Sequence, residues 1–260
     1  MDFARLVSRQ RAHFLTGATR SLGYRRAQLR RLLEVIETHE AALSDALFAD
    51  LRKSPHEAYA TEIGLVLSEI RHALRHLPAW MRPQRRRVPL MTWPARGSIR
   101  SEPFGVALII GPWNYPLQLM LSPLVGALAA GNCVIVKPAS AATLCAYELC
   151  RCFWDAGISQ NTLQFVPCSG VLAGEHLVKN AKVDFVILTG GEETAYAMLK
   201  DRPNLFLSAE TGGKDATIVT AMADRDQAIK NVIHSAFSNS GQKCSATSLL
   251  VLEEEVYHDP

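Results

Sequence analysis

The stretch from Val106 to Val136, VALIIGPWNYPLQLMLSPLVGALAAGNCVIV, decides the fold. It begins with an apolar run at Val106–Ile110 and ends with a second one at Cys133–Val136. Between them, Leu117–Ala130 has the length and composition of a buried helix. Continuous apolar strands on either side of a helix are typical of a parallel sheet, because right-handed crossovers place helices on both of its faces. The stretch therefore predicts one strand–helix–strand unit of a parallel sheet.

The same alternation continues toward the C-terminus. Further strands are predicted at Leu163–Val166, Phe185–Leu188, Leu205–Ser208 and Ala216–Thr220, and further helices at Thr143–Ala156, Val171–Asn180, Glu193–Lys200 and Asp226–Ser238. On the N-terminal side, residues from Ala4 to about Trp80 have the helical spacing of apolar side chains, with a break at Ser54–Pro55. The predicted fold class is α/β, with a doubly wound, mostly parallel Rossmann-like sheet and a helical N-terminal lead-in.

Composition excludes several classes of function. The 260 residues are 48% hydrophobic with a formal net charge of +3, so we expect a globular protein with no general affinity for nucleic acid. The longest apolar stretch, Leu117–Ala130, is short for a membrane span and contains Ser122 and Pro123. The six cysteines form no CxxC pair and show no metal-ligand spacing. We therefore expect free thiols, no metal site and a reducing compartment, with the cytoplasm as the default localisation.

Two segments are rich in arginine. Arg82 and Arg85–Arg87 lie in a proline-rich stretch, for which we favour a solvated linker or hairpin over a patch that binds a polyanion. The first thirty-one residues contain eight arginines against the single acid Asp2, a bias that is also found in mitochondrial transit peptides. An apolar helical stripe from Leu22 to Ile36 continues past this region. The stripe favours a folded first helix over a transit peptide.

Four short segments combine glycines with polar side chains near the predicted strand ends. They are GPWNYP at Gly111–Pro116, VKPAS at Val136–Ser140, AETGGK at Ala209–Lys214 and NSGQKCSA at Asn239–Ala246. The last two place a carboxylate, Glu210, and a thiol, Cys244, in turns bracketed by glycines. Taken singly, each residue favours a structural role, and the G-x-G-x-x-G fingerprint of dinucleotide sites is missing. Together and in this order, the four segments resemble the signature set of the aldehyde dehydrogenase superfamily.

The resemblance implies oxidation of an aldehyde to a carboxylic acid with NAD or NADP. Cys244 corresponds to the nucleophile that forms a thiohemiacetal with the aldehyde. The oxyanion of this thiohemiacetal would accept hydrogen bonds from the Cys244 backbone amide and the Asn114 side-chain amide. Transfer of a hydride to the nicotinamide leaves a thioester, and Glu210 corresponds to the base that activates water to hydrolyse it. The substrate partner is a small-molecule aldehyde.

The resemblance also assigns a cofactor site. The matching positions are Ile110, Trp113, Lys137, Ser140, Gly190 and Gly191. Lys137 corresponds to the lysine that contacts the adenine ribose, whereas Ser140 replaces a glutamate that binds the ribose hydroxyls in many NAD-using members. Loss of this carboxylate removes repulsion against a 2′-phosphate and favours acceptance of NADP. Glu192 and Glu193 put negative charge at a helix start that otherwise suits phosphate, which weakens the expected cofactor affinity.

Two branches of the family contribute to the likeness. Residues from about Arg11 to Leu144 are similar to the class 3 branch, which acts on medium-chain, fatty and aromatic aldehydes. From about Trp154 onward the sequence is more similar to glutamate-semialdehyde dehydrogenases. Neither the aldehyde nor the choice between NAD and NADP follows from the residues.

The resemblance divides the chain into three parts. Residues 1–81 and 102–208 correspond to the dinucleotide-binding domain, 82–101 to part of an oligomerisation hairpin, and 209–260 to the start of an α/β catalytic domain. Because family members continue well beyond this length, we expect a shortened protein with weak or no turnover. We also expect Ser248–Leu252 to form an unpaired apolar edge, and any homo-oligomer to lack its C-terminal interface strand. A catalytically silent dinucleotide-binding module and an interaction fragment are the alternatives.

Overall fold

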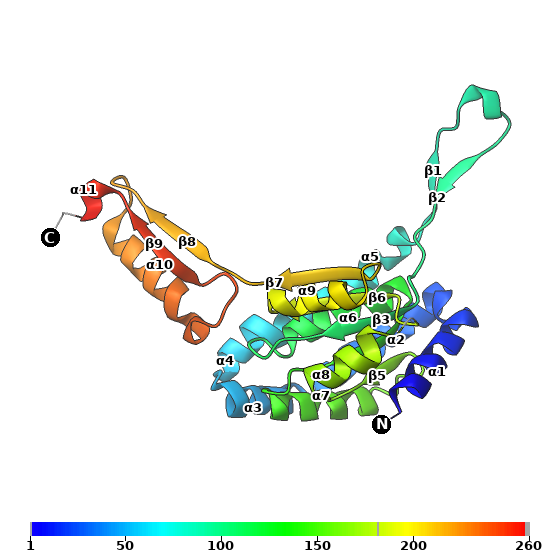
Figure 1. Ribbon diagram of the computed structural model, residues 1–260, viewed down its shortest axis with the longest axis horizontal. Coiled ribbons are helices and arrows are strands. Elements are labelled where there is room, and N and C mark those ends of the chain that lie inside the picture. Colours follow the sequence, from blue (N-terminus) through cyan, green and yellow to red (C-terminus); the bar gives the residue numbers. More distant parts are fainter. Residues whose placement is uncertain (1, 181, 258–260) are drawn as a thin grey trace.

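The computed structural model describes residues 2–180 and 182–257. Figure 1 shows a central α/β body, a hairpin that projects from it, and a smaller C-terminal unit at the end of an extended connection. The α-helices are α1 Phe3–Leu15, α2 Leu22–Thr38, α3 Glu40–Leu51, α4 Pro55–Ala58, α5 Gly64–Trp80, α6 Gln118–Ala130, α7 Thr143–Asp155, α8 Gly170–Ala173, α9 Glu192–Asp201, α10 Arg225–Phe237 and α11 Glu254–Tyr257. Short 3-10 helices are η1 Ala18–Arg20, η3 Leu90–Thr92 and η5 Ser238–Gly241, and π-helical turns are η2 Tyr59–Ile63 and η4 Gly174–Val178. The strands are β1 Gln84–Arg86, β2 Gly97–Ile99, β3 Val106–Ile110, β4 Cys133–Lys137, β5 Leu163–Phe165, β6 Phe185–Gly190, β7 Phe206–Thr211, β8 Asp215–Val219 and β9 Thr247–Leu252.

The central sheet is parallel throughout and has the order β5-β4-β3-β6-β7. The chain enters at the middle strand β3, moves outward through β4 and β5, and then crosses to the other side of β3 for β6 and β7. This arrangement confirms the predicted doubly wound α/β sheet. A reversal of strand order opens a crevice at the carboxyl ends of the strands beside β3, where ligands bind in folds of this kind.

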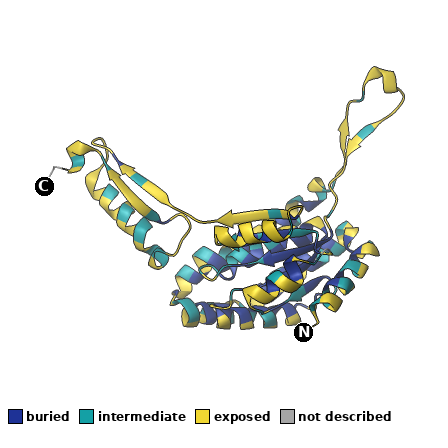
Figure 2. Ribbon diagram, in the orientation of Figure 1, coloured by how far each residue is buried: buried dark blue, intermediate teal, exposed yellow. Residues whose placement is uncertain are grey.

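Helices cover both faces of the sheet because neighbouring strand residues point in opposite directions. On one face, Ala107 and Ile109 of β3 pack into a cluster with the buried side chains of α2, α3, α5, α6 and α7. On the other face, Val106 and Leu108 pack with residues of α1, η4 and α9. Figure 2 shows the resulting buried layer along the middle of the body. Burial on both faces explains why β3 and β4 read as uninterrupted apolar runs.

Helix α1 is an integral part of this core, as the stripe beyond the arginine-rich start indicates. Its side chains Val7 and Phe14 are buried, and the buried Gln10 donates from Nε2 to the Val134 carbonyl oxygen at 2.9 Å. Arg11 forms an ion pair with Asp184, the residue directly before β6. The prediction of a folded first helix is confirmed.

The arginine-rich segment forms the projecting hairpin seen in Figure 1. Strands β1 and β2 pair antiparallel, with Gln84 opposite Ile99, and their residues are largely exposed. At the tip of the hairpin, Leu90 and Met91 are 87% and 98% exposed. The hairpin interpretation is confirmed, whereas its use in oligomerisation stays a prediction.

Three elements differ in detail from the prediction. Strand β7 continues to Thr211, because its ladder with β6 extends to the pair Gly190–Thr211, so that Glu210 lies in a strand and not in a turn. The helix predicted at Val171–Asn180 is divided into α8 and the π-helical turn η4. Strand β9, expected at Ser248–Leu252 as an unpaired apolar edge, pairs in parallel with β8 on one side, and helix α10 connects the two strands. Within residues 2–180 and 182–257, no strand pairs with its other edge.

Candidate active site

A cavity of about 1120 Å³ lies at the carboxyl ends of the central strands and extends to the C-terminal unit. All nine side chains or glycines that the sequence singled out line it: Ile110, Trp113, Asn114, Lys137, Ser140, Gly190, Gly191, Glu210 and Cys244. The strand pairing explains part of this convergence, since Ile110 lies opposite Lys137 and Gly190 lies opposite Thr211 at the same sheet edge. The structure thus brings together residues that are separated by more than half of the chain.

The loop between β3 and α6 forms one wall of the cavity. Gly111 is required at its start, because an added Cβ would lie 2.2 Å from Cγ of Met120. The Gly111 amide donates to the Lys137 carbonyl oxygen at 3.1 Å and ties the loop to the end of β4. At the other end of the loop, Nδ2 of Asn114 donates to the Gln242 carbonyl oxygen at 2.7 Å. The loop therefore joins the sheet edge to the thiol segment.

The thiol segment begins with a sharp reversal of the chain after α10. Asn239, Ser240 and Gly241 have φ of 51°, 56° and 70°, so three consecutive residues adopt the left-handed conformation that only glycine enters readily. Cys244 follows this reversal as an exposed free thiol. Gly213, with φ of 138°, passes so close that a Cβ there would lie 2.0 Å from the Cys244 carbonyl oxygen. Both glycines therefore set the path that presents the thiol to the cavity.

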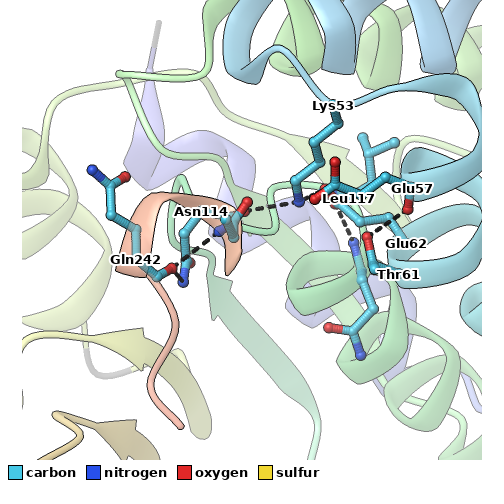
Figure 3. Close-up of polar contacts among 9 residues, drawn as sticks. Lys53, Glu57, Thr61, Glu62, Asn114, Leu117 and Gln242 are labelled. Atoms are coloured by element: carbon cyan, nitrogen blue, oxygen red, sulfur yellow. Dashed lines mark hydrogen bonds and ion pairs between the residues drawn. The ribbon is translucent and has the colours of Figure 1, made fainter. Parts of the chain in front are cut away.

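A buried ion pair supports the loop from behind and escaped the sequence prediction. Lys53 and Glu62 are 1% and 0% exposed, and Nζ lies 2.5 Å from Oε1. Figure 3 shows both side chains directed toward the loop that carries Asn114. The sequence spacing could have indicated that Glu62 is buried. It lies about one helical turn before Val66 and two turns before Ile70, on the same buried face. A carboxylate on an apolar stripe needs a buried partner, and Lys53 supplies it.

Burial shifts the pKa of Glu62 and of Lys137. Desolvation raises the pKa of Glu62, and the charge and hydrogen bond of Lys53 oppose this effect only in part. Desolvation lowers the pKa of Lys137, which lies at the end of β4 among cavity-lining residues. Glu210 is exposed at the end of β7, in register with Thr189. Glu192 and Glu193 occupy the first turn of α9, where the sequence placed them.

The aldehyde dehydrogenase family profile matches residues 1–259. The chain belongs to the aldehyde dehydrogenase family. It is 35% identical over 262 residues to human aldehyde dehydrogenase family 3 member B1, and the match covers 96% of this chain and 53% of that protein. This relative supports the class 3 likeness, whereas the likeness to glutamate-semialdehyde dehydrogenases stays a prediction.

Solved structures of aldehyde dehydrogenases share the fold. A substrate-bound enzyme from Staphylococcus aureus superposes with a TM-score of 0.91 at 30% identity, over 97% of this chain and 55% of that one. An NAD⁺ complex from Bacillus cereus gives a TM-score of 0.89 at 26% identity, over 98% of this chain and 52% of that one. The chain spans about half the length of the curated relatives it matches. Among the described residues, no helix is long and apolar enough to cross a membrane.

Proposed function

We propose that this aldehyde dehydrogenase oxidises a small-molecule aldehyde to a carboxylic acid with NAD or NADP, through a covalent intermediate on Cys244. The observation that carries the proposal is one cavity lined by a thiol, an amide and a carboxylate, namely Cys244, Asn114 and Glu210. Family membership supports aldehyde oxidation as the reaction class. Cys244 is exposed to the cavity and free of a disulfide, as attack on a carbonyl carbon requires.

The residues at the strand ends fit a dinucleotide. The Lys137 side chain is buried, lines the cavity and has no hydrogen-bond partner among residues 2–180 and 182–257. The amine opens into the cavity and is not among the buried polar atoms that lack a partner, so it can reach the hydroxyl or phosphate oxygens of a ligand there. In this proposal Lys137 and Ser140 hold the adenine ribose, while Ile110 and Trp113 line the apolar wall and Gly190–Gly191 lets the backbone approach the ligand. When bound, the nicotinamide accepts the hydride of the substrate.

The side chains of this protein have separate tasks in the reaction. The Cys244 thiolate attacks the carbonyl carbon and forms a C–S bond, so that the carbonyl oxygen becomes an oxyanion. Asn114 has two amide hydrogens, and the hydrogen bond to Gln242 uses only one of them. The second hydrogen and the Cys244 backbone amide stabilise the oxyanion. After the carbon has lost its hydride, the acyl group remains on sulfur as a thioester.

Glu210 completes the cycle as a general base. Its carboxylate lies at the end of β7, three residues before Gly213, which passes close to Cys244. It removes a proton from water, the resulting hydroxyl oxygen bonds to the acyl carbon, and the C–S bond breaks to release the acid and the thiolate. This step consumes one water for each aldehyde that is oxidised.

Trapping the acyl intermediate tests this assignment. The Glu210→Gln protein is incubated with hexanal and NADP or NAD, and the mass of the Cys244 peptide is measured. We expect an added acyl group on Cys244 that persists at least tenfold longer than in the wild type, because the base is absent. Cys244→Ala should show neither the adduct nor reduced cofactor. Failure of the wild type and Glu210→Gln to form any adduct at Cys244, with cofactor bound, contradicts the proposed function.

The domain roles follow from the same proposal. Residues 1–81 and 102–208 bind the dinucleotide, 209–260 supply the nucleophile, and the hairpin within 82–101 contacts a second copy of the chain. The likeness of residues from about Arg11 to Leu144 to the class 3 branch favours medium-chain, fatty or aromatic aldehydes over glutamate semialdehyde as the substrate. Aldehyde-dependent NADH and NADPH formation with hexanal, benzaldehyde and glutamate semialdehyde separates these substrate classes.

A dinucleotide-binding module without turnover is the second candidate. The observation in its favour is that the five-stranded sheet has helices and buried clusters on both faces, whereas β8, β9 and α10 keep exposed apolar side chains such as Ile233, Leu249 and Leu250. A binding module shows an upward shift of the melting temperature with NAD or NADP that persists in Cys244→Ala. Such a shift without aldehyde oxidation would favour this candidate.

A further inference from the structure

The ion pair between Lys53 and Glu62 is unusual for its complete burial. Lys53 lies after α3 and Glu62 in the π-helical turn η2, and both side chains have lost nearly all contact with water. Desolvation of two charges costs several kcal/mol for each ion, so that a buried pair is often no more stabilising than apolar residues of similar volume. Stability alone therefore gives a weak reason for these two residues.

Among the described residues, the remaining polar contacts of the pair go to the β3–α6 loop and to the first residue of α6. Nζ of Lys53 donates to the Asn114 backbone carbonyl oxygen at 3.0 Å and lies 3.8 Å from the centroid of the Tyr115 ring. Oε2 of Glu62 accepts from the amides of Leu117 at 2.8 Å and Gln118 at 3.2 Å. Helix α6 has no side-chain cap at its own N-cap residue, so Glu62 supplies the acceptor for its first amides. The pair thus fixes the backbone on both sides of Tyr115.

The same loop makes direct contact with the thiol segment. Nδ2 of Asn114 donates to the Gln242 carbonyl oxygen, two residues before Cys244. Asn239 donates from Nδ2 to the same oxygen at 3.1 Å and to the Asn114 carbonyl oxygen at 3.4 Å. Figure 3 shows Asn114 between Lys53 on one side and Gln242 on the other. A continuous set of contacts therefore connects the buried ion pair with the residues next to the nucleophile.

We propose that Lys53 and Glu62 are positioning residues that hold the Asn114 amide where the oxyanion of the Cys244 adduct forms. The inference rests on the proposed function, because it assigns the pair a task in that reaction. Donors in a site of this kind work only when they are held within about 0.5 Å of the productive geometry. The loop has no side-chain cap at Leu117, and the pair supplies the missing restraint.

A variant that removes both charges tests the proposal with little change in volume. Lys53→Met keeps the aliphatic stem, and Glu62→Gln keeps an oxygen that can accept from the first amides of α6. The double variant leaves no unpaired buried charge, so we expect it to fold. The matched control is Lys179→Met with Glu175→Gln, the same change at an exposed pair with Nζ and Oε1 2.7 Å apart.

The readout separates oxyanion stabilisation from general damage. Without cofactor, benzaldehyde protects Cys244 from iodoacetamide by forming the reversible thiohemiacetal, and peptide mass spectrometry gives its apparent Kd. Alkylation itself forms no oxyanion and does not use Asn114. In Lys53→Met/Glu62→Gln we expect the Kd of benzaldehyde to rise about tenfold, while the alkylation rate without aldehyde stays within twofold of the wild type. The control should match the wild type in both quantities.

A second test asks whether the pair acts through Asn114. Asn114→Ala in the wild-type background should also raise the Kd about tenfold, but less than twofold when added to the double variant, because both changes remove the same donor. If the double variant does not melt cooperatively, Lys53→Arg replaces it, since it keeps the charge but moves the donors. A threefold or larger rise in Kd then supports the proposal, and an unchanged Kd overturns it.

The proposed function and the role of the ion pair can fail separately. If benzaldehyde does not protect Cys244 in the wild-type protein, the proposed function is contradicted and the inference falls with it. Protection in the wild type that is lost in Asn114→Ala but kept in Lys53→Met/Glu62→Gln overturns the inference alone. Fully additive losses also overturn it, because they show that the pair acts independently of Asn114.

Discussion

The Cα of Gly213 faces the backbone of Cys244 so closely that a Cβ on Gly213 would lie 2.0 Å from the Cys244 carbonyl oxygen. Gly213 also has φ of 138°, a conformation that other residues rarely adopt. The position of the nucleophile therefore depends on the absence of a side chain thirty-one residues earlier in the sequence.

Gly213→Ala should destabilise the protein and displace Cys244. Backbone strain costs about 1–3 kcal/mol, and the contact with the Cys244 backbone adds to it. Each kcal/mol lowers the melting temperature of a chain of this size by roughly 2–4 °C. Gly212→Ala is the matched control, because its φ of 71° brings strain but its Cβ would meet no atom within 4 Å. Equal decreases in melting temperature for Gly213→Ala and Gly212→Ala would show that the contact with the Cys244 backbone does not add to the destabilisation.

Alkylation should single out Cys244 among the six thiols. Cys244 is exposed, whereas burial raises the pKa of Cys133 and of Cys152 to about 12 and keeps these thiols protonated near neutral pH. Iodoacetamide at pH 8 should modify Cys244 at least tenfold faster than Cys133 or Cys152 in the native protein, as peptide mass spectrometry would measure. Rapid modification of Cys133 without loss of the fold would argue against the buried position of β4.

The stability of the protein should carry the pH signature of Glu62. Because burial raises the folded-state pKa of Glu62 above its ordinary value of 4.5, the folded state binds a proton more tightly than the unfolded state. The contribution of Glu62 is fully present below about 4.5 and is lost as pH rises through the raised pKa. The unfolding free energy of the wild type minus that of Lys53→Met/Glu62→Gln should therefore fall from acid to neutral pH. Urea titrations at several pH values measure this difference, and a rising difference would contradict the assignment.

Ser140 should influence the choice of cofactor. In Ser140→Glu, a carboxylate in the exposed turn after β4 would repel the 2′-phosphate of NADP and hydrogen-bond the ribose of NAD. We expect the NADP affinity to fall roughly tenfold, which is about 1.4 kcal/mol, and the NAD affinity to be kept or increased. Gln160→Glu adds the same charge before β5, at the amino ends of the parallel strands, away from the cavity. It should change neither the NAD affinity nor the NADP affinity. Thermal shifts with each cofactor test this, and parallel changes for NAD and NADP would refute the role of Ser140.

The sequence predicted the strands and helices of the core well because burial on two faces leaves a local record. Strand β3 was predicted with its observed bounds, and α7 with its observed start, from uninterrupted apolar runs and helical spacing. The extension of β7 through Glu210 to Thr211 was missed, because it depends on pairing with Thr189 and Gly190 of the neighbouring strand β6. The split of the helix at Val171–Asn180 into α8 and η4 has no local signal that we can identify.

The candidate site was predicted by resemblance, and its support was not. Short sequence segments typical of the family contain Cys244, Glu210 and Asn114, and the structure places these residues around one cavity. Lys53 and Glu62 have no such segment, because their importance comes from contacts with residues more than fifty positions away. Only the place of Glu62 on an apolar helical face pointed to a buried partner. Contacts between residues so far apart in the sequence can be identified only in the folded structure.

The hydrogen bond between Asn114 and Gln242 closes a loop of 128 residues. Closing a loop costs more entropy as it lengthens, so contacts between distant residues form after local ones have organised the chain. The helices and the first strand pairs can form without this contact, whereas the oxyanion site cannot. During refolding, circular dichroism should therefore recover before benzaldehyde protects Cys244. The capacity to bind an aldehyde would then mark the end of folding and give a stricter criterion of the native state than secondary structure.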